Sequence, residues 1–320
     1  MNHLPYNKLL SFLHNPLSKK LPGLRVYTYH GVIGINKLSH LERNFHTIAE
    51  FRQHIDFFRK KNVISLNDLS EIVNSGKKIE KDLVLITFDD GYANNLVAAE
   101  ILKKYELPAT FFVSTYYIGA QESIWTVNLS LLLLRGEAKI IEFDNERFSL
   151  ETIEDRIKNF RIIRNSIKVK DRQDRFEACE NITNQFRSGE IQRLLELYPY
   201  FKMMNWEEVI NLASSGFSIQ SHGHTHEMHH GNQSSVAIEE EIICSKTIIE
   251  EKLKNKCFAF AFPNGNFNEY SCSILKNNDY GLGFTTESGL NIDLGNNFTL
   301  SRLNPNRKIL KMKNSYNSGE

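Results

Sequence analysis

Short, nearly continuous runs of apolar residues recur along the chain, and each is bounded by polar residues or glycine. Runs of this kind are typical of strands that are covered on both faces, as in a parallel sheet. We therefore expect strands at residues 24–29, 82–88, 107–113 and 257–262. Further strands, with fewer apolar residues, are expected at residues 216–221, 281–286 and 298–303, where the alternation with helices continues.

Between these runs, apolar residues recur at helical spacing instead. The aromatic and aliphatic side chains between Phe45 and Phe58 predict a helix with one face turned inward. Further helices are expected at residues 94–105, 206–214 and 235–253. The alternation of strands and helices predicts a parallel α/β architecture.

The segment from about residue 126 to residue 200 breaks this alternation. It is rich in charged residues and mostly helical in its period. We interpret it as a helical insertion in a barrel domain of residues 24–308, and as a cover for the core rather than a second catalytic unit. Residues 1–23 are then an N-terminal extension, and residues 309–320 a polar C-terminal tail.

Composition narrows the function by exclusion. The chain has 320 residues, 41% of them apolar, and its 39 basic and 38 acidic residues give a formal net charge of +1. This balance leaves no electrostatic footprint for nucleic acid, so we expect no nucleic-acid partner. No run approaches the ~20 apolar residues of a membrane span, and the N-terminal residues show no signal-peptide pattern, which predicts a cytoplasmic protein.

Two adjacent carboxylates, Asp89 and Asp90, directly follow the strand expected at residues 82–88. At the end of a buried strand, desolvation and mutual repulsion both oppose their ionisation, and a bound cation removes that cost. Because neighbouring strand residues point to opposite sides, the two carboxylates need not share one role. The alternative is that Asp90 caps the next helix while Asp89 is solvated.

Five of the 11 histidines lie between His222 and His230, directly after the strand expected at residues 216–221. Imidazole is a common ligand of divalent metals. The i, i+4 spacing of His222 and His226 places both rings on one side of a helical turn, although His226 and His230 share that spacing. Since His222 follows a strand as Asp90 does, we expect Asp90, His222 and His226 to be the metal ligands.

The remaining histidines of the cluster, His224, His229 and His230, are expected in a solvent-exposed loop. An alternative pairs His222 with His224, as in barrel metallohydrolases of the amidohydrolase type. That arrangement calls for an early strand and for further histidines on later strands, whereas no histidine follows His230.

The sequence resembles the polysaccharide deacetylases of carbohydrate esterase family 4, which include chitooligosaccharide deacetylases. Residues 87–92 (TFDDGY) resemble the first motif of that family, residues 221–226 (SHGHTH) the second, and residues 262–265 (FPNG) a variant of the third. The resemblance implies a distorted (β/α)7-type barrel. It also implies a hydrolase that removes N-acetyl groups from an amino-sugar-containing saccharide in polysaccharide metabolism.

The same resemblance implies roles for individual residues. Asp89 would be the general base, and Asp90, His222 and His226 would bind a divalent metal, with zinc first and Co, Fe, Mn or Ni as alternatives. Contacts with the carbohydrate substrate are expected from Tyr92, Trp125, Phe262, Pro263 and Gly265.

The chain departs from the family pattern at two functional positions. The third motif lacks the arginine that in many members orients the base, and no other residue obviously replaces it. The histidine that usually acts as the acid is missing from residues 299–303. The candidates for the protonation step are His30, Arg302 as an electrostatic substitute, and the metal-bound water itself. The alternative is a deacetylase-like protein that binds a glycan without turnover.

Overall fold

A parallel sheet of six strands forms the centre of the computed structural model, which describes residues 22–35 and 40–318. The strands lie in the order β1-β4-β5-β8-β9-β10. Their bounds are β1 Leu24–Tyr29, β4 Leu83–Phe88, β5 Thr110–Val113, β8 Ser218–Ser221, β9 Ala259–Ala261 and β10 Leu282–Phe284. Every strand residue except Ser218 is buried, so the sheet is covered on both faces as the apolar runs predict.

Residues 298–303 close the gap between β10 and β1. Leu300 forms a parallel bridge with Phe284 of β10, and Leu303 forms one with Tyr27 of β1. Leu303 also exchanges two backbone hydrogen bonds with β1, of 2.7 and 3.0 Å. The segment is too briefly paired to be a regular strand, yet it occupies the seventh position of the sheet. The expected distorted (β/α)7-type barrel is therefore confirmed.

Helices cover the outside of this sheet. They are α1 Ile48–Phe58, α2 Leu66–Ser75, α3 Asn95–Lys104, α8 Trp206–Ser214, α9 Ser235–Leu253 and α10 Glu269–Asn277. The helix expected from Phe45 begins only at Ile48, because Thr47 caps it in a reciprocal pair of hydrogen bonds with Glu50. Phe45 lies instead in β3, Phe45–Thr47, which pairs with β2, Gly31–Ile33.

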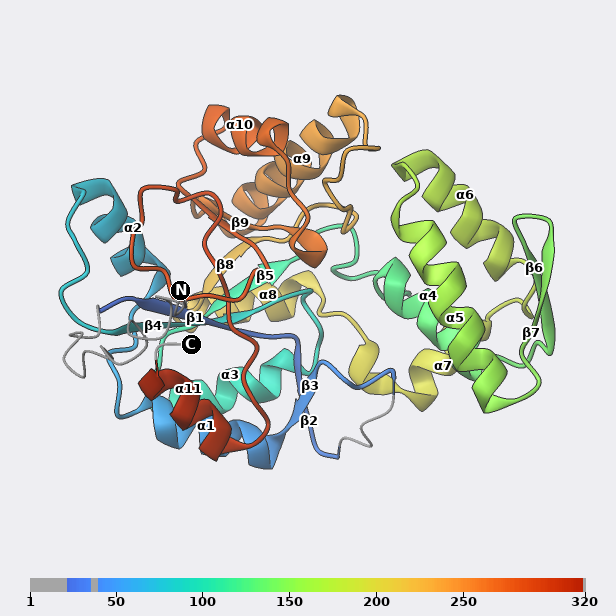
Figure 1. Cartoon of the computed structure of the whole chain (residues 1–320), viewed down its shortest axis with the longest axis horizontal. Coiled ribbons are helices and arrows are strands. Elements are labelled where there is room, and N and C mark those ends of the chain that lie inside the picture. The colour runs from blue at the N-terminus through green and yellow to red at the C-terminus, as the bar shows by residue number, and fades with distance from the viewer. Residues whose placement is uncertain (1–21, 36–39, 319–320) are drawn as a thin grey trace, which may run out of the picture.

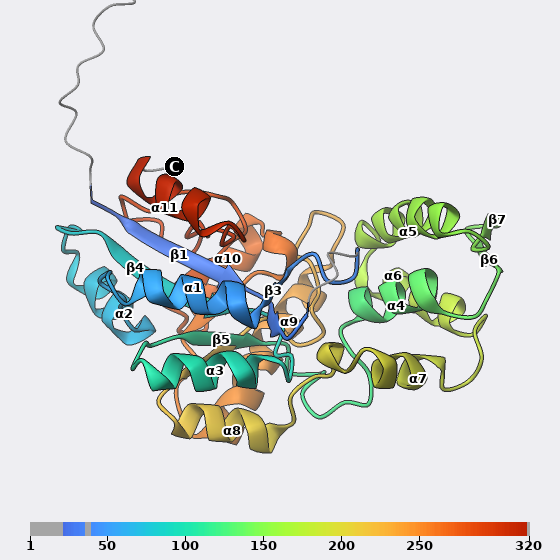
Figure 2. The same cartoon turned by 90° about the horizontal axis from the view of Figure 1, so that it is seen from below.

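The insertion forms a lobe beside the barrel (Figure 1, Figure 2). It contains α4 Trp125–Arg135, β6 Ile140–Phe143, β7 Glu146–Ser149, α5 Ile153–Lys168, α6 Arg172–Thr183, α7 Glu190–Leu197 and the short 3-10 helix Pro199–Phe201. The sequence pattern does not predict the hairpin of β6 and β7. Its turn places Asp144 and Asn145 at φ values of 48° and 64°, the backbone of a two-residue primed turn. The lobe shares an apolar core with Phe45, Tyr92 and Met228 of the barrel.

The C-terminal segment forms helix α11, Ile309–Ser318, so the expectation of a polar tail is wrong. Met312 and Tyr316 lie one helical turn apart and are both buried against the barrel. The guanidinium of the fully buried Arg25 lies 4.2 Å from the centre of the Tyr316 ring and donates to the Tyr316 carbonyl oxygen at 3.0 Å. Met312 and Tyr316, together with the partly buried Ile309, pack this otherwise polar segment on the barrel.

Of the N-terminal extension expected at residues 1–23, residues 1–21 lie outside the described residues. Within residues 22–35 and 40–318, the structure contains no helix with the length and apolar character needed to cross a membrane.

Candidate active site

Asp90, which follows β4, meets two histidines from the loop that follows β8. Its Oδ1 atom lies 3.3 Å from Nε2 of His222 and 3.4 Å from Nε2 of His226. All three residues are buried, and among the described residues they are the only group of potential ligands close enough together to hold a metal ion. The structure thus brings together the three residues that the sequence predicts as ligands.

The histidine loop, residues 222–227, brings the two rings together without a helical turn. Gly223 and His226 have φ values of 79° and 59°, so the chain curls back on itself. The buried carboxylate of Glu241 in α9 accepts hydrogen bonds of 2.6–3.3 Å from three amides and one hydroxyl of the loop. A Cβ atom at Gly223 would lie 2.8 Å from this carboxylate. The i, i+4 spacing therefore brings the rings together through a loop that folds around a buried carboxylate, not through a helical turn.

The carboxylates of Asp89 and Asp90 favour the positively charged form of the neighbouring His222. Burial lowers the pKa of His222, but the charges of Asp89 and Asp90 outweigh burial and raise it above the usual value. Burial opposes the ionisation of Asp90, yet hydrogen bonds from His222 and His226 hold its pKa well below the usual range. The Nδ1 atom of His222 donates to the Ala261 carbonyl oxygen at 2.7 Å, which leaves Nε2 to face the carboxylate.

The donor set and its spacing fit a divalent metal. Two ligand atoms that each lie about 2.0–2.1 Å from a tetrahedral zinc ion are about 3.3–3.4 Å apart. The separations of Asp90 from His222 and His226 match that value. His224 stands outside this group, because its Nδ1 atom lies 2.8 Å from the Thr115 hydroxyl. The geometry therefore does not favour the amidohydrolase-type pair of His222 and His224.

Asp89 forms a buried ion pair with Arg302, beside the group of three. The two terminal nitrogens of Arg302 donate to the two carboxylate oxygens at 2.7 and 2.8 Å, and its Nε atom donates to the Thr285 carbonyl oxygen at 2.7 Å. Burial opposes the ionisation of Asp89, but the charge and hydrogen bonds of Arg302 prevail and lower its pKa. An arginine therefore orients Asp89 after all, from the segment that closes the barrel.

Sequence reasoning considered Arg302 only as an acid or an electrostatic substitute, and missed its contact with Asp89. The two residues are 213 positions apart. The one available signal was an arginine between Leu300 and Leu303 in an expected strand, where an unpaired buried charge would be costly.

A cavity of about 490 Å³ opens over these residues and is lined by Asp89, Asp90, His222 and His226 among others. Of the further residues that the sequence proposed, Tyr92 and His30 also line it. Tyr92 is buried, and burial together with the neighbouring Asp90 raises the pKa of its hydroxyl well above the usual value. His30 follows β1, and its charge lowers the pKa values of both Asp89 and Asp90.

The other residues expected to contact substrate do not line this cavity. Phe262 is fully buried and packs on Phe260 and Phe267. Gly265 has a φ of 74°, and a Cβ atom there would lie 2.0 Å from the Thr286 hydroxyl, so this turn requires glycine. Pro263 is buried as well. The third motif reaches the cavity through Asn264, between Pro263 and Gly265, which sequence reasoning did not select.

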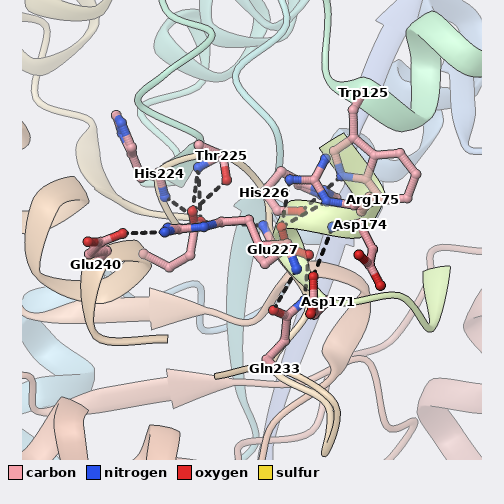
Figure 3. Close-up of polar contacts among 12 residues, drawn as sticks. Trp125, Asp171, Asp174, Arg175, His224, Thr225, His226, Glu227, Gln233 and Glu240 are labelled. Carbon is pink, nitrogen blue, oxygen red and sulfur yellow. Dashed lines mark hydrogen bonds and ion pairs between the residues drawn. The ribbon is translucent and has the colours of Figure 1, made fainter. Parts of the chain in front are cut away.

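Trp125 and the buried ion pair of Arg175 and Glu227 both support the histidine loop. Its Nε1 atom donates to the His226 carbonyl oxygen at 3.3 Å, and the Arg175 guanidinium lies 5.0 Å from the centre of the Trp125 ring. Figure 3 shows Arg175 between Trp125 and Glu227. Arg175 of α6 donates to Glu227 at 2.6 and 2.8 Å, and Gln233 donates to the other carboxylate oxygen at 2.8 Å. The insertion is thus connected directly to the loop that carries His226.

His229 does not lie in a solvent-exposed loop as expected. It is fully buried against the rings of Phe260 and Phe262. Burial lowers the pKa of His229 to about 3, so it packs as a neutral ring. His224 and His230 are partly buried.

Known structures share this fold. Streptococcus pyogenes deacetylase PplD in complex with acetate is 17% identical, with a TM-score of 0.61 over 94% of this chain and 99% of that one. IcaB from Ammonifex degensii is also 17% identical, with a TM-score of 0.60 over 92% and 97% of the two chains. A de-N-acetylase from Aggregatibacter actinomycetemcomitans is 16% identical, with a TM-score of 0.54 over 89% and 95%.

Sequence comparison assigns the family. No curated protein matches the chain. The sequence model of the polysaccharide deacetylases matches residues 76–145 and 177–283, more than half of the chain and including Asp89, Asp90, His222 and His226. The unmatched stretch between the two ranges lies within the insertion lobe. With these motifs on this barrel, the chain belongs to the polysaccharide deacetylase family.

Proposed function

We propose that this protein is a metal-dependent hydrolase that removes N-acetyl groups from an amino-sugar-containing saccharide. The observation that carries the proposal is the meeting, in one cavity, of three residues that could hold a metal ion and a carboxylate paired with an arginine. Membership of the polysaccharide deacetylase family supplies the class of substrate.

Asp90, His222 and His226 would hold the metal. One carboxylate and two imidazoles suit zinc, and also Co, Fe, Mn or Ni, and leave positions open for water and substrate. When bound, such a cation lowers the pKa of a coordinated water and polarises the acyl oxygen.

Asp89 is the general base in this proposal. Arg302 keeps the carboxylate ionised in a buried place, so that it can accept the proton of the attacking water. The bidentate contact also fixes the carboxylate plane, because both of its oxygens are engaged by one rigid guanidinium.

His30 is the proposed acid for the departing nitrogen. It lines the cavity and interacts electrostatically with both aspartates. Arg302 is unsuited to this step, because a guanidinium does not release its proton and every nitrogen of Arg302 already donates to Asp89 or Thr285. His46 also lines the cavity, but its Nε2 atom contacts the Pro305 carbonyl oxygen and burial lowers its pKa to about 4.

Acetate release from N-acetylated saccharides tests the activity, with Asp89→Asn as the decisive variant. We expect kcat to fall by about 10²–10⁴-fold while the metal content, measured by mass spectrometry, stays unchanged. Asp56→Asn is the matched control, because Asp56 is exposed on α1 and forms only a surface ion pair. Equal activity of Asp89→Asn and wild type would refute Asp89 as the base, and no turnover on any N-acyl substrate would favour a glycan-binding protein.

Metal content separates the two histidine assignments. His226→Ala should lose the metal, whereas His224→Ala should retain it, since His224 lies outside the group of ligands. Retained metal in His226→Ala would overturn the proposed ligand set.

A further inference from the structure

The insertion supplies one wall of the active-site cavity. Phe160, Arg164 and Lys168 of α5 line the cavity and are spaced four residues apart, so they form one face of that helix. Thr126 and Ser130 of α4 line it as well. Phe160, Arg164 and Lys168 lie in residues 146–176, which the family model does not match, whereas Thr126 and Ser130 lie within the matched residues 76–145.

Three cations gather at this wall: Arg43, Arg164 and Lys168. Among the residues that the structure describes, none of them has a carboxylate within 4.0 Å. Lys168 donates to the amide oxygen of Asn264 at 2.8 Å, and Arg164 donates to that of Asn165 at 3.2 Å. The Nε atom of Arg164 is buried without a partner in the described part of the chain.

A fourth cation at the cavity, Arg307, differs from these three because it already has partners. Arg307 also lines the cavity, but it pairs with Glu50 at 3.3 Å and donates to the carbonyl oxygens of Arg43 and Phe45. Its role is thus structural, and it is not counted in the cationic cluster of Arg43, Arg164 and Lys168.

The cationic cluster is electrostatically unfavourable by itself. Burial and the charges of Arg164 and Arg43 lower the pKa of Lys168 to about 8. Burial, Arg43 and Arg161 lower the pKa of Arg164. The whole chain has a formal net charge of only +1, so this concentration of charge is local to the cavity. A bound anion would relieve both the repulsion and the unpaired donors.

We propose that the cationic cluster binds a phosphate group of the substrate, so that the enzyme acts on a phosphate-bearing N-acetylated saccharide rather than on a neutral glycan. This inference rests on the proposed function. The planar forks of Arg43 and Arg164 and the point charge of Lys168 suit a multiply charged oxyanion. The phosphate can come from a nucleotide-diphosphate sugar or from phosphodiesters within a polymer, and the experiment distinguishes these two sources.

Pyrophosphate binding tests the anion site directly. With the metal site loaded in all proteins, calorimetry should show that Arg164→Gln/Lys168→Gln raises the Kd of pyrophosphate by at least about tenfold relative to wild type. The control is Lys158→Gln/Arg147→Gln, which removes the same charge from exposed positions outside the cavity. Equal Kd changes in the two double variants would overturn the proposal, and their melting temperatures check that both are folded.

Substrate preference provides the second arm. The kcat/KM for acetate release is compared for uridine-diphosphate-linked N-acetylglucosamine, a phosphodiester-linked N-acetylglucosamine polymer and a neutral chitooligosaccharide. We expect one phosphorylated substrate to be preferred by wild type, and that preference to fall at least about tenfold in the cavity variant but not in the control. Preference for the neutral substrate would overturn the inference and leave the deacetylase proposal intact. No turnover on any substrate would refute the deacetylase proposal, and pyrophosphate binding alone would then decide the anion site.

Discussion

At the scale of single residues, the site contains both what the sequence predicts best and what it cannot predict. Asp90, His222 and His226 could be chosen from sequence because each lies in a short run of chemically distinctive residues at a predicted strand end. The partner of Asp89 could not, because Arg302 comes from a distant segment and meets Asp89 only when the sheet curls into a barrel. Local patterns carry no information about that pairing.

Arg302→Met should destabilise the protein and impair catalysis together. It leaves the buried carboxylate of Asp89 without a counter-ion, which typically costs about 3–5 kcal/mol of unfolding free energy. Urea unfolding measures this loss, and Arg302→Lys should lose less because the charge remains. Asp89→Asn/Arg302→Met should be more stable than Arg302→Met alone. If the double variant is instead less stable, repulsion of an unpaired charge is not the cause.

Lys168 should make anion binding depend on pH above neutrality. Its pKa is lowered from 10.5 to about 8, so the free protein loses this positive charge as the pH rises through about 8, and affinity for an anion should then fall. Arg164 and Arg43 keep their charge in this range, Asn264 does not titrate, and burial lowers the pKa of His226 so that it is neutral throughout.

Lys168→Arg is the matched variant, because its charge persists at every pH used. The Kd of pyrophosphate, measured between pH 7 and pH 9.5, should rise more steeply for wild type than for Lys168→Arg. Titration of pyrophosphate itself affects both proteins alike. Parallel curves would exclude Lys168 from the binding site.

At the scale of elements, the histidine loop depends on two helices, α6 and α9, which contribute none of the proposed metal ligands. Glu241 of α9 holds the loop from within, and Arg175 of α6 holds Glu227 and Trp125 beside it. The helices themselves were predictable from apolar spacing, and α8 and α9 have the expected bounds. The loop was not, because positive φ at His226 and the buried Glu241 both reflect tertiary contacts.

Removing the Arg175–Glu227 pair should weaken metal binding. The Nδ1 atom of His226 has no partner among the described residues, so the position of its ring depends on the backbone that Trp125 and Glu227 support. For Arg175→Met/Glu227→Met we expect about a 10–100-fold rise in the Kd of the metal, as when other supporting contacts of metal ligands are lost. Competition with a chromogenic chelator measures this constant.

Arg172→Met is the control for this prediction. Arg172 lies on the same helix α6, but its ion pair with Glu240 is largely exposed and contributes little. Its metal Kd should stay within about twofold of wild type. A similar loss in both variants would indicate that the insertion acts only through general stability.

At the scale of the whole molecule, the barrel follows from the alternation of apolar runs and helical stretches, and this level was the most predictable. The exceptions are segments whose structure depends on docking. Residues 298–303 bridge two strands without forming a regular one, and α11 was taken for a tail because few of its residues are apolar, with Met312 and Tyr316 its buried ones. A segment with so few apolar residues can be recognised as a docked element only when the surface on which it packs is known.

Deleting residues 309–320 should lower the global stability. The deletion exposes the surface that covers Met312 and Tyr316 and removes two contacts of the buried Arg25, so we expect a loss of about 3 kcal/mol or more in urea unfolding. Lys313→Ala, at an exposed position of α11, should change stability by less than about 0.5 kcal/mol. An unchanged unfolding free energy after the deletion would show that α11 does not contribute to the barrel's stability.

The ion pair between Asp89 and Arg302 also sets an order of events. Asp89 is synthesised early and its counter-ion late, and a piece of the chain contains both only if it spans residues 89–302. A ribosome-bound chain that has not yet extended past residue 302 can hold the three proposed metal ligands and still lack an oriented carboxylate at Asp89. Under the proposed function, hydrolysis with an oriented base therefore requires translation past residue 302, and a product that stops before that residue could bind metal without one.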